Sequence, residues 1–274
     1  MTKVKRLLLF LVILSCGVTS WAQRGWEAGG WVGAANYFGD LNTNYDLTDM
    51  GAAGGIIARY NFNERISLRF GAHYGQLSAD DADSHNAYER ARNLHFESEI
   101  MDGMAVFEFN FLPYVHGSKD YFFTPYVFAG LSAFHYNPKA EYNGELIELR
   151  PLGTEGQFKG EEYFSISGGL AYGLGVKFDL NFQWSINIEL SARSLFTDYL
   201  DDVSTVYPDK SDLRRSRGEL AVALSDRSIV IPELSDATVG RAGQQRGHSN
   251  TNDQYVFLSA GMVYYFGDLR CPTY

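Results

Sequence analysis

The chain has 274 residues, of which 45% are hydrophobic, 15% aromatic and 20% charged, and its formal net charge is −10. This composition excludes a disordered chain, a collagen-like repeat and a disulfide scaffold, and the acidic balance argues against a nucleic-acid partner. Its 18 tyrosines, 19 phenylalanines and 28 glycines favour an aromatic, β-rich architecture over a helical bundle.

The first expected element is an export signal. Basic residues precede an apolar run at Leu7–Leu14, which is too short to cross a bilayer as a helix. Small side chains at Ser20 and Ala22 predict cleavage after Ala22, so that residues 1–22 form a signal peptide. In the alternative interpretation, a lipobox ends at Cys16 and this cysteine is lipidated.

Beyond the signal, no run of 18 apolar residues exists, which excludes a helical membrane protein. Instead, apolar and polar residues alternate with period two, most clearly from Phe164 to Phe178 and again over residues 66–75 and 184–193. Aromatic residues at strand ends favour a membrane barrel over a soluble sandwich, because membrane barrels carry aromatic girdles at both interfaces. These residues are Tyr74, Phe178, Trp184 and Tyr265.

Eight strands are expected, an even number near the minimum for an outer-membrane barrel. They span Trp26–Tyr37, Gly51–Asn61, Ile66–Gly75, Phe96–Phe111, Pro125–Tyr136, Phe164–Phe178, Trp184–Ser194 and Tyr255–Phe266. The connections alternate between short turns, such as 62–65, and long loops, the longest being 195–254. We therefore predict an all-β fold, an antiparallel transmembrane β-barrel over residues 23–266 with short periplasmic turns, long extracellular loops and both termini in the periplasm. The register of the first, second and fourth strands stays open.

An eight-stranded barrel is just wide enough to be filled by its own side chains. Polar residues at inward positions are therefore expected to form a closed network in the barrel interior, which does not conduct large solutes. These residues are Arg69, His73, Glu108, Asn110, Lys177, Glu189 and Arg193. A pore lining is the alternative interpretation of the same residues.

No motif for chemistry is found. The six histidines never form HExxH, and neither GxSxG nor a P-loop occurs, so we expect no catalytic residue, cofactor, metal or small-molecule substrate. Asp80, Asp81 and Asp83 lack the glycine and distal glutamate of a calcium loop, and a solvated acidic surface loop is expected there. A basic run at Arg214–Arg217 is either simply exposed or a contact for lipopolysaccharide phosphate.

If Cys16 leaves with the signal peptide, Cys271 is the only thiol of the mature chain. It lies in residues 267–274, a tail that follows the last strand and that barrel topology places in the periplasm. An odd cysteine in an exported protein predicts an intermolecular disulfide or another partner contact, and an incidental free thiol is the alternative.

Four stretches carry a resemblance to a known family. They are YFGDLN at residues 37–42, RYN at 59–61, RNLHFES at 92–98 and TDYLDDVS at 197–204. They resemble the PorG-type outer-membrane β-barrels of the type IX secretion system of Bacteroidetes, although His95 and Glu97 stand where Ser and Arg are commoner in that family. The resemblance implies a non-enzymatic barrel that holds a periplasmic ring, made of a PorK-type lipoprotein and a PorN-type protein, to the outer membrane. It also makes the ring lipoprotein a candidate partner of Cys271.

Two of these stretches begin where a strand ends on the long-loop side. Their polar residues either shape turns, by capping strand-end amides, or form a docking surface for a translocon component. These residues are Asp40, Asn42, Asp198, Asp201 and Asp202. A stand-alone OmpA-like or OmpX-like barrel, serving envelope integrity or surface adhesion, is the alternative function.

Overall fold

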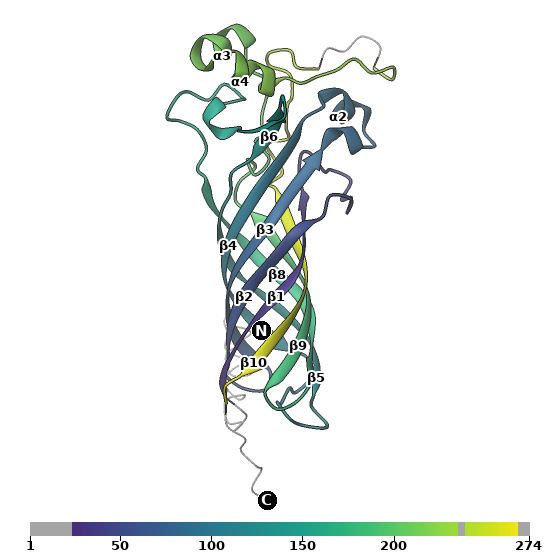
Figure 1. Ribbon diagram of the computed structural model, residues 1–274, viewed down its shortest axis with the longest axis vertical. Helices are drawn as coiled ribbons and strands as arrows, with labels where there is room; N and C mark the ends of the chain where they lie inside the picture. The colour runs from purple at the N-terminus through teal and green to yellow at the C-terminus, as the bar shows by residue number, and fades with distance from the viewer. Residues whose placement is uncertain (1–23, 235–238, 268–274) are drawn as a thin grey trace, which may run out of the picture.

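The computed structural model describes residues 24–234 and 239–267. Eight antiparallel strands close into a barrel in the order β3-β2-β1-β10-β9-β8-β5-β4, with β4 paired back to β3 (Figure 1). The strands are β1 Gly25–Phe38, β2 Gly51–Asn61, β3 Ile66–Asp80, β4 His95–Asn110, β5 Phe123–His135, β8 Ile166–Asp179, β9 Trp184–Leu195 and β10 Gln254–Tyr265. The predicted fold class is confirmed. The expected signal peptide, Cys16 and Cys271 lie outside the described residues.

Alternation along each strand sets the two faces of the barrel wall. In β8, Leu170, Tyr172 and Leu174 point outward and are 48%, 42% and 58% exposed, whereas Ala171 and Lys177 point inward and are buried. The outward positions of the other strands are apolar too, so an apolar belt surrounds the barrel. None of the helices in the described segments is long and apolar enough to cross a bilayer.

Glycines on the inner wall make room for large inward side chains from neighbouring strands. A Cβ atom at Gly173 would lie 2.5 Å from the ring of Phe128, and one at Gly175 would lie 2.8 Å from the ring of Tyr126. Gly173 is paired directly with Phe128 on β5, and Gly175 with Tyr126. The interior is therefore filled by side chains that the glycines accommodate.

β3 runs to Asp80, five residues beyond the predicted end at Gly75. The prediction failed there because the polarity of the two faces reverses above the paired residues Tyr74 and Met101. Above that level, the outward residues are polar and the inward ones apolar. On β3, Gln76 and Ser78 point outward, and Leu77 and Ala79 point inward. On β4, Glu97 and Glu99 point outward, and Phe96 and Ile100 point inward. The sheet thus continues past the apolar belt as a cylinder with a polar outer face and an apolar interior, as in a water-soluble barrel.

The long loops carry structure of their own at this end of the barrel (Figure 1). The hairpin of β6 (Lys139–Tyr142) and β7 (Glu145–Glu148) extends from β4. The other elements are η1 (Asp81–Asp83), α2 (Ala87–Arg92), η2 (Arg150–Leu152), α3 (Lys210–Arg217) and α4 (Glu219–Ser225). Together with their connections, residues 39–50, 81–94, 136–165, 196–234 and 239–253, they form what we call the cap.

Aromatic side chains surround the opposite end, where the short turns lie. This girdle consists of Trp26, Tyr60, Phe62, Phe109, Phe111, Phe178, Trp184, Tyr264 and Phe266. The prediction that Tyr265 belongs to it is wrong, because β10 alternates so that Tyr264 and Phe266 face outward and Tyr265, 2% exposed, faces the interior.

Candidate functional site

A layer of buried ion pairs crosses the barrel interior on the side of the short turns. Its centre is Glu108 of β4, whose carboxylate oxygens lie 2.7 Å from Arg59 Nε, 2.8 Å from Arg69 Nε and 2.7 Å from Lys177 Nζ. Glu27 accepts from Arg59 Nη1 at 2.6 Å, and Glu189 accepts from Arg69. Three cations thus face three carboxylates, which is how charges are kept stable away from water.

A second layer lies nearer the cap. Arg193 Nε donates to Asp102 Oδ2 at 2.7 Å, and the Tyr255 hydroxyl donates to the same oxygen at 2.7 Å. His73 instead lies among aromatic rings, 5.3 Å from Trp31 and 5.9 Å from Phe257 between ring centroids. Above this layer, apolar side chains such as Phe96, Phe134 and Phe257 continue into the cap as one core.

All seven residues expected in the polar network are buried inside the barrel wall, although His73 stands apart from its ion pairs. Sequence reasoning missed Glu27, Arg59 and Asp102, which complete the network. The alternation could have identified Glu27 and Arg59, since each occupies an inward position between outward-facing neighbours on its strand. Asp102 lies in β4, where the reversal of polarity obscured the alternation.

The turn between β4 and β5 closes the interior at the turn end. His116 enters the barrel from this turn, with Nε2 at 3.0 Å from Glu27 Oε1 and Nδ1 at 2.9 Å from Asp179 Oδ1. Its ring stacks on Tyr265 at 4.4 Å between centroids. Burial lowers the pKa of His116, but the hydrogen bonds with Asp179 and Glu27 outweigh burial and raise that pKa to about 9. His116 is therefore an imidazolium at neutral pH and joins β1, β8 and β10.

The TDYLDDVS stretch lies in the cap immediately after β9 and fastens it to the barrel. Tyr37, at the end of β1, donates its hydroxyl proton to Asp201 Oδ2 at 2.5 Å. Asp201 Oδ1 accepts from the backbone of Val203 at 2.9 Å. Asp202 has a positive φ of 67° and binds the hydroxyls of Thr154 and Tyr163. These contacts join the end of β1 to the 150–163 loop.

The guanidinium of Arg246 supports the same stretch from the segment before β10. It lies 3.2 Å from Glu155 Oε1 and 3.6 Å from Asp202 Oδ2. Glu155 also accepts from the backbone amides of Ser204 and Thr205 at 2.8 and 3.0 Å. Burial outweighs the charge of Arg246 and raises the pKa of Asp202 to about 6.

The YFGDLN stretch is held in the same cluster. Asp40 Oδ2 accepts from the backbone of His248 at 2.8 Å, while Arg92 donates to the Asp40 carbonyl oxygen at 2.6 Å. Asn42 closes its own turn, since Oδ1 accepts from the Asp46 amide at 3.0 Å and Nδ2 donates to the Tyr37 carbonyl at 2.8 Å. Asp40, Asp198, Asp201 and Asp202 are each 8% exposed or less. None of these carboxylates is presented on the surface of the cap.

The acidic stretch after β3 divides into two parts. Asp80 and Asp83 lie at the surface, but Asp81 is fully buried and accepts two hydrogen bonds from Arg92, at 2.8 and 2.7 Å. The prediction of a solvated loop is therefore wrong for Asp81, because Arg92 of α2 folds back over it. Burial, opposed by Arg92, raises the pKa of Asp81 to about 6.

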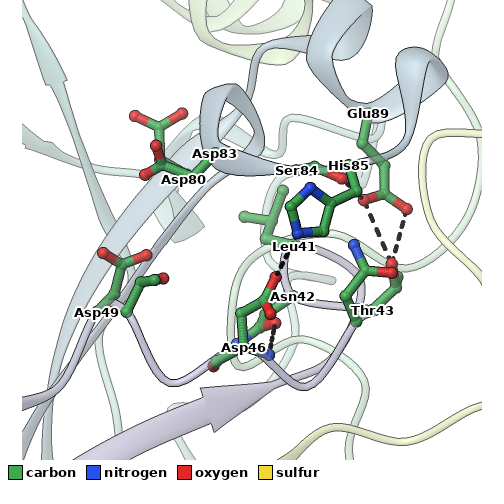
Figure 2. A pocket seen from close by; sticks show the side chains of 12 residues that line it. Leu41, Asn42, Thr43, Asp46, Asp49, Asp80, Asp83, Ser84, His85 and Glu89 are labelled. Carbon is green, nitrogen blue, oxygen red and sulfur yellow. Dashed lines mark hydrogen bonds and ion pairs between the residues drawn. The ribbon is translucent and has the colours of Figure 1, made fainter.

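A small acidic cavity of about 110 Å³ lies between the 41–49 loop and the segment around η1 (Figure 2). Glu89 on its wall accepts hydrogen bonds from Thr43 and Ser84, and Asp46 faces His85 at 3.8 Å. Burial and the nearby carboxylates of Asp83 and Asp80 raise the pKa of Asp49. In the part of the chain that the structure describes, no three His, Cys, Asp or Glu side chains are arranged to hold a metal ion.

The basic run of α3 has acidic partners within the chain. Arg217 pairs with Glu162 at 2.6 Å and Arg214 with Glu219 at 2.7 Å, while Arg215 lies 3.4 Å from Asp212. A phosphate group would have to compete with these carboxylates for each of the three guanidinium groups.

A family model described as "Domain of unknown function (DUF6089)" matches residues 5–220, so the chain belongs to that family. No curated protein matches the chain. Among solved structures, it is similar to Neisserial surface protein A (NspA), with 13% identity over 88% of this chain and 97% of the other and a TM-score of 0.44. The outer membrane protein OprG of Pseudomonas aeruginosa gives 12% identity over 90% and 98%, also with a TM-score of 0.44. Likeness at this level transfers no activity to this chain.

Proposed function

Because the chain belongs to the DUF6089 family and folds as a closed barrel with an apolar belt, we propose that it is an integral outer-membrane protein. A closed sheet satisfies its backbone hydrogen bonds internally, which a bilayer requires. The belt extends from the aromatic girdle at the turn end to the level of Tyr74 and Met101, where outward residues become polar. In this orientation the short turns and both termini face the periplasm, and the cap faces the cell exterior.

Within the membrane, the protein acts as a non-enzymatic component of a type IX secretion system, in which it anchors or organises the periplasmic ring. The observation that carries this proposal is the filled interior. Two layers of buried ion pairs and an apolar core occupy the barrel, so its function rests on its surfaces and ends rather than on transport through it.

The resemblance to PorG-type barrels supplies the proposed partners, a PorK-type lipoprotein and a PorN-type ring protein. Three of the four stretches that carry it meet in one bonded cluster. Tyr37 of residues 37–42 bonds Asp201 of residues 197–204, and Arg92 of residues 92–98 bonds the backbone of Asp40. The resemblance thus concerns residues that work together in this fold.

Cys271 gives this proposal its first experiment. Native outer membranes are run on reducing and non-reducing gels and probed for this protein, with wild type beside Cys271→Ser. We expect a heavier band in wild type that collapses with reductant and is absent from the variant, and mass spectrometry of that band tests for the ring lipoprotein. A monomer in every lane removes the covalent link, and co-purification of the ring proteins after chemical crosslinking then decides the secretion role.

A stand-alone barrel for envelope integrity or adhesion is the second candidate, and the elaborated cap favours it. Two variants separate the two functions. Deleting residues 211–247, which include α3 and α4, should abolish surface binding by an adhesin and leave secretion normal. Cys271→Ser should impair secretion if the protein is a secretion component, although its cap is intact, and should leave an adhesin unaffected.

A further inference from the structure

A tyrosine hydroxyl in the cap lies between two carboxyl groups. Tyr37 Oη is 2.5 Å from Asp201 Oδ2 and 3.0 Å from Asp253 Oδ1. All three side chains are 1% exposed or less. In the described residues neither carboxyl group has an ion-pair partner, because the buried Arg246 pairs with Asp202 and Glu155 instead.

The protons of this group can be counted. A tyrosine hydroxyl has one proton and donates it to one acceptor. The shorter contact assigns that proton to Asp201, so Asp253 faces the lone pairs of the hydroxyl oxygen. The 3.0 Å contact is then a hydrogen bond only if Asp253 carries a proton. Asp253 Oδ2 already accepts from the Leu200 amide at 2.9 Å, which places the proton on Oδ1.

The site is sealed from solvent by Gly39 of the YFGDLN stretch. A Cβ atom there would lie 2.1 Å from both Tyr37 Oη and Asp253 Oδ1, so the backbone at position 39 covers the pair directly. Two ionised carboxylates that share one buried hydroxyl, with no cationic side chain paired to either in the described residues, would be strongly unfavourable.

Other titratable groups face this site from each neighbouring element. Asp40 after β1, Asp198 after β9, and Tyr136 and Tyr163 in the 136–165 loop interact with its carboxyl groups directly. Glu155, Arg92, Arg246 and His248 lie around Asp40 and Asp202 in turn. Burial and the charges of Asp253 and Asp40 raise the pKa of Asp201 well above its usual range, and burial and the charge of Asp198 do the same for Asp253. The surroundings therefore favour a protonated carboxyl group.

We propose that Asp253, Tyr37 and Asp201 form a proton-dependent clasp that fastens the cap to the barrel, and that loss of the proton on Asp253 Oδ1 releases it. The clasp joins the end of β1, the segment after β9 and the residue before β10. The closed clasp binds one more proton than the open one, so its closure weakens as the pH rises.

The variant Asp253→Asn tests this clasp, because its amide NH₂ can donate permanently to Tyr37 Oη while its oxygen still accepts from Leu200. Hydrogen exchange of the amides in 196–205 and 246–254 is measured in full-length protein in phospholipid nanodiscs from pH 5 to 9, corrected for intrinsic rates. Between the ordinary pKa of an aspartate, about 4, and the raised pKa of Asp253 in the closed clasp, the opening constant of wild type should rise about tenfold per pH unit. In Asp253→Asn the slope should be smaller by the one proton that Asp253 contributes.

Asp202→Asn is the matched control, because Asp202 pairs with Arg246 and not with Tyr37. It should increase opening at every pH and, above pH 7, where Asp202 is already ionised in wild type, keep the wild-type slope. Equal slopes in wild type and Asp253→Asn, or a flat wild type, would overturn the proposal. Should Asp253→Asn not fold, the infrared spectrum of wild type at pH 7 decides, since absence of the carbonyl band of a protonated carboxylic acid also overturns it.

Discussion

At the scale of single residues, the barrel interior depends on one carboxylate that serves three cations. Glu108 contacts Arg59, Arg69 and Lys177. All four side chains are 2% exposed or less, so water does not screen these charges. Removing one partner of a buried ion pair leaves its counterpart charged in a medium of low dielectric constant.

We therefore expect Glu108→Gln to lower the free energy of unfolding by about 3–5 kcal/mol. Urea unfolding in detergent micelles, followed by tryptophan fluorescence, measures this. Glu97→Gln on the same strand is the control, because Glu97 faces outward above the apolar belt and should change stability by less than about 0.5 kcal/mol. Equal effects of the two substitutions would show that the ion-pair layer does not stabilise the barrel.

His116 predicts a pH dependence at the turn end. Its pKa in the folded state, about 9, is above the ordinary value of 6.5, so the stabilisation it gives is complete below pH 6.5 and is lost as the pH rises through about 9. His116→Phe keeps a ring against Tyr265 but cannot be protonated. The difference in unfolding free energy between wild type and this variant should be at most about 3 kcal/mol at pH 6 and shrink by pH 10. His135→Phe, on the outer face of β5, is the comparison, and its difference from wild type should not follow this curve.

At the scale of elements, β8 shows how one strand serves two environments. Its outward residues are large and apolar, whereas its inward residues are mostly small, because Phe128 and Tyr126 of β5 occupy the space above them. A larger side chain is therefore tolerated on the outward face of β8 and not on its inward face.

Gly173→Ala should destabilise the barrel by about 1–3 kcal/mol, since its Cβ would lie 2.3 Å from the Leu190 carbonyl oxygen and 2.5 Å from the Phe128 ring. Gly168→Ala on the same strand meets its nearest atoms at 3.4 Å, an ordinary contact, and should be tolerated. The urea midpoints of both variants test this. A Gly168→Ala variant as unstable as Gly173→Ala would contradict the steric explanation.

At the scale of the whole molecule, the interior is closed independently at several levels. The Glu108 layer and the His116 turn close it towards the short turns, and the apolar core under the cap closes it at the other end. Planar-bilayer recording should therefore show no large stable conductance. Deleting residues 211–247 should not open a channel either, because the Glu108 layer remains. A porin-sized current from wild type would contradict a filled interior.

The sequence by itself located the eight strands of the barrel wall and the apolar face of their membrane-spanning parts, because alternation follows from the local geometry of an extended backbone. It also placed seven polar residues at inward positions. It did not predict the β6–β7 hairpin, which lies within an expected loop. It could not locate the end of β3, since the reversal of polarity above Tyr74 has no local cause and reflects where the apolar belt stops.

Only the tertiary structure decided which groups meet. Tyr37 and Asp201 are 164 positions apart, and Arg69 and Glu189 are 120 apart, so their pairing depends on the register of every strand between them. The sequence left turn chemistry and docking open for the aspartates of TDYLDDVS. The fold buries them against Tyr37, Arg246 and Thr154, because closing the barrel brings the ends of β1, β9 and β10 together beneath one cap.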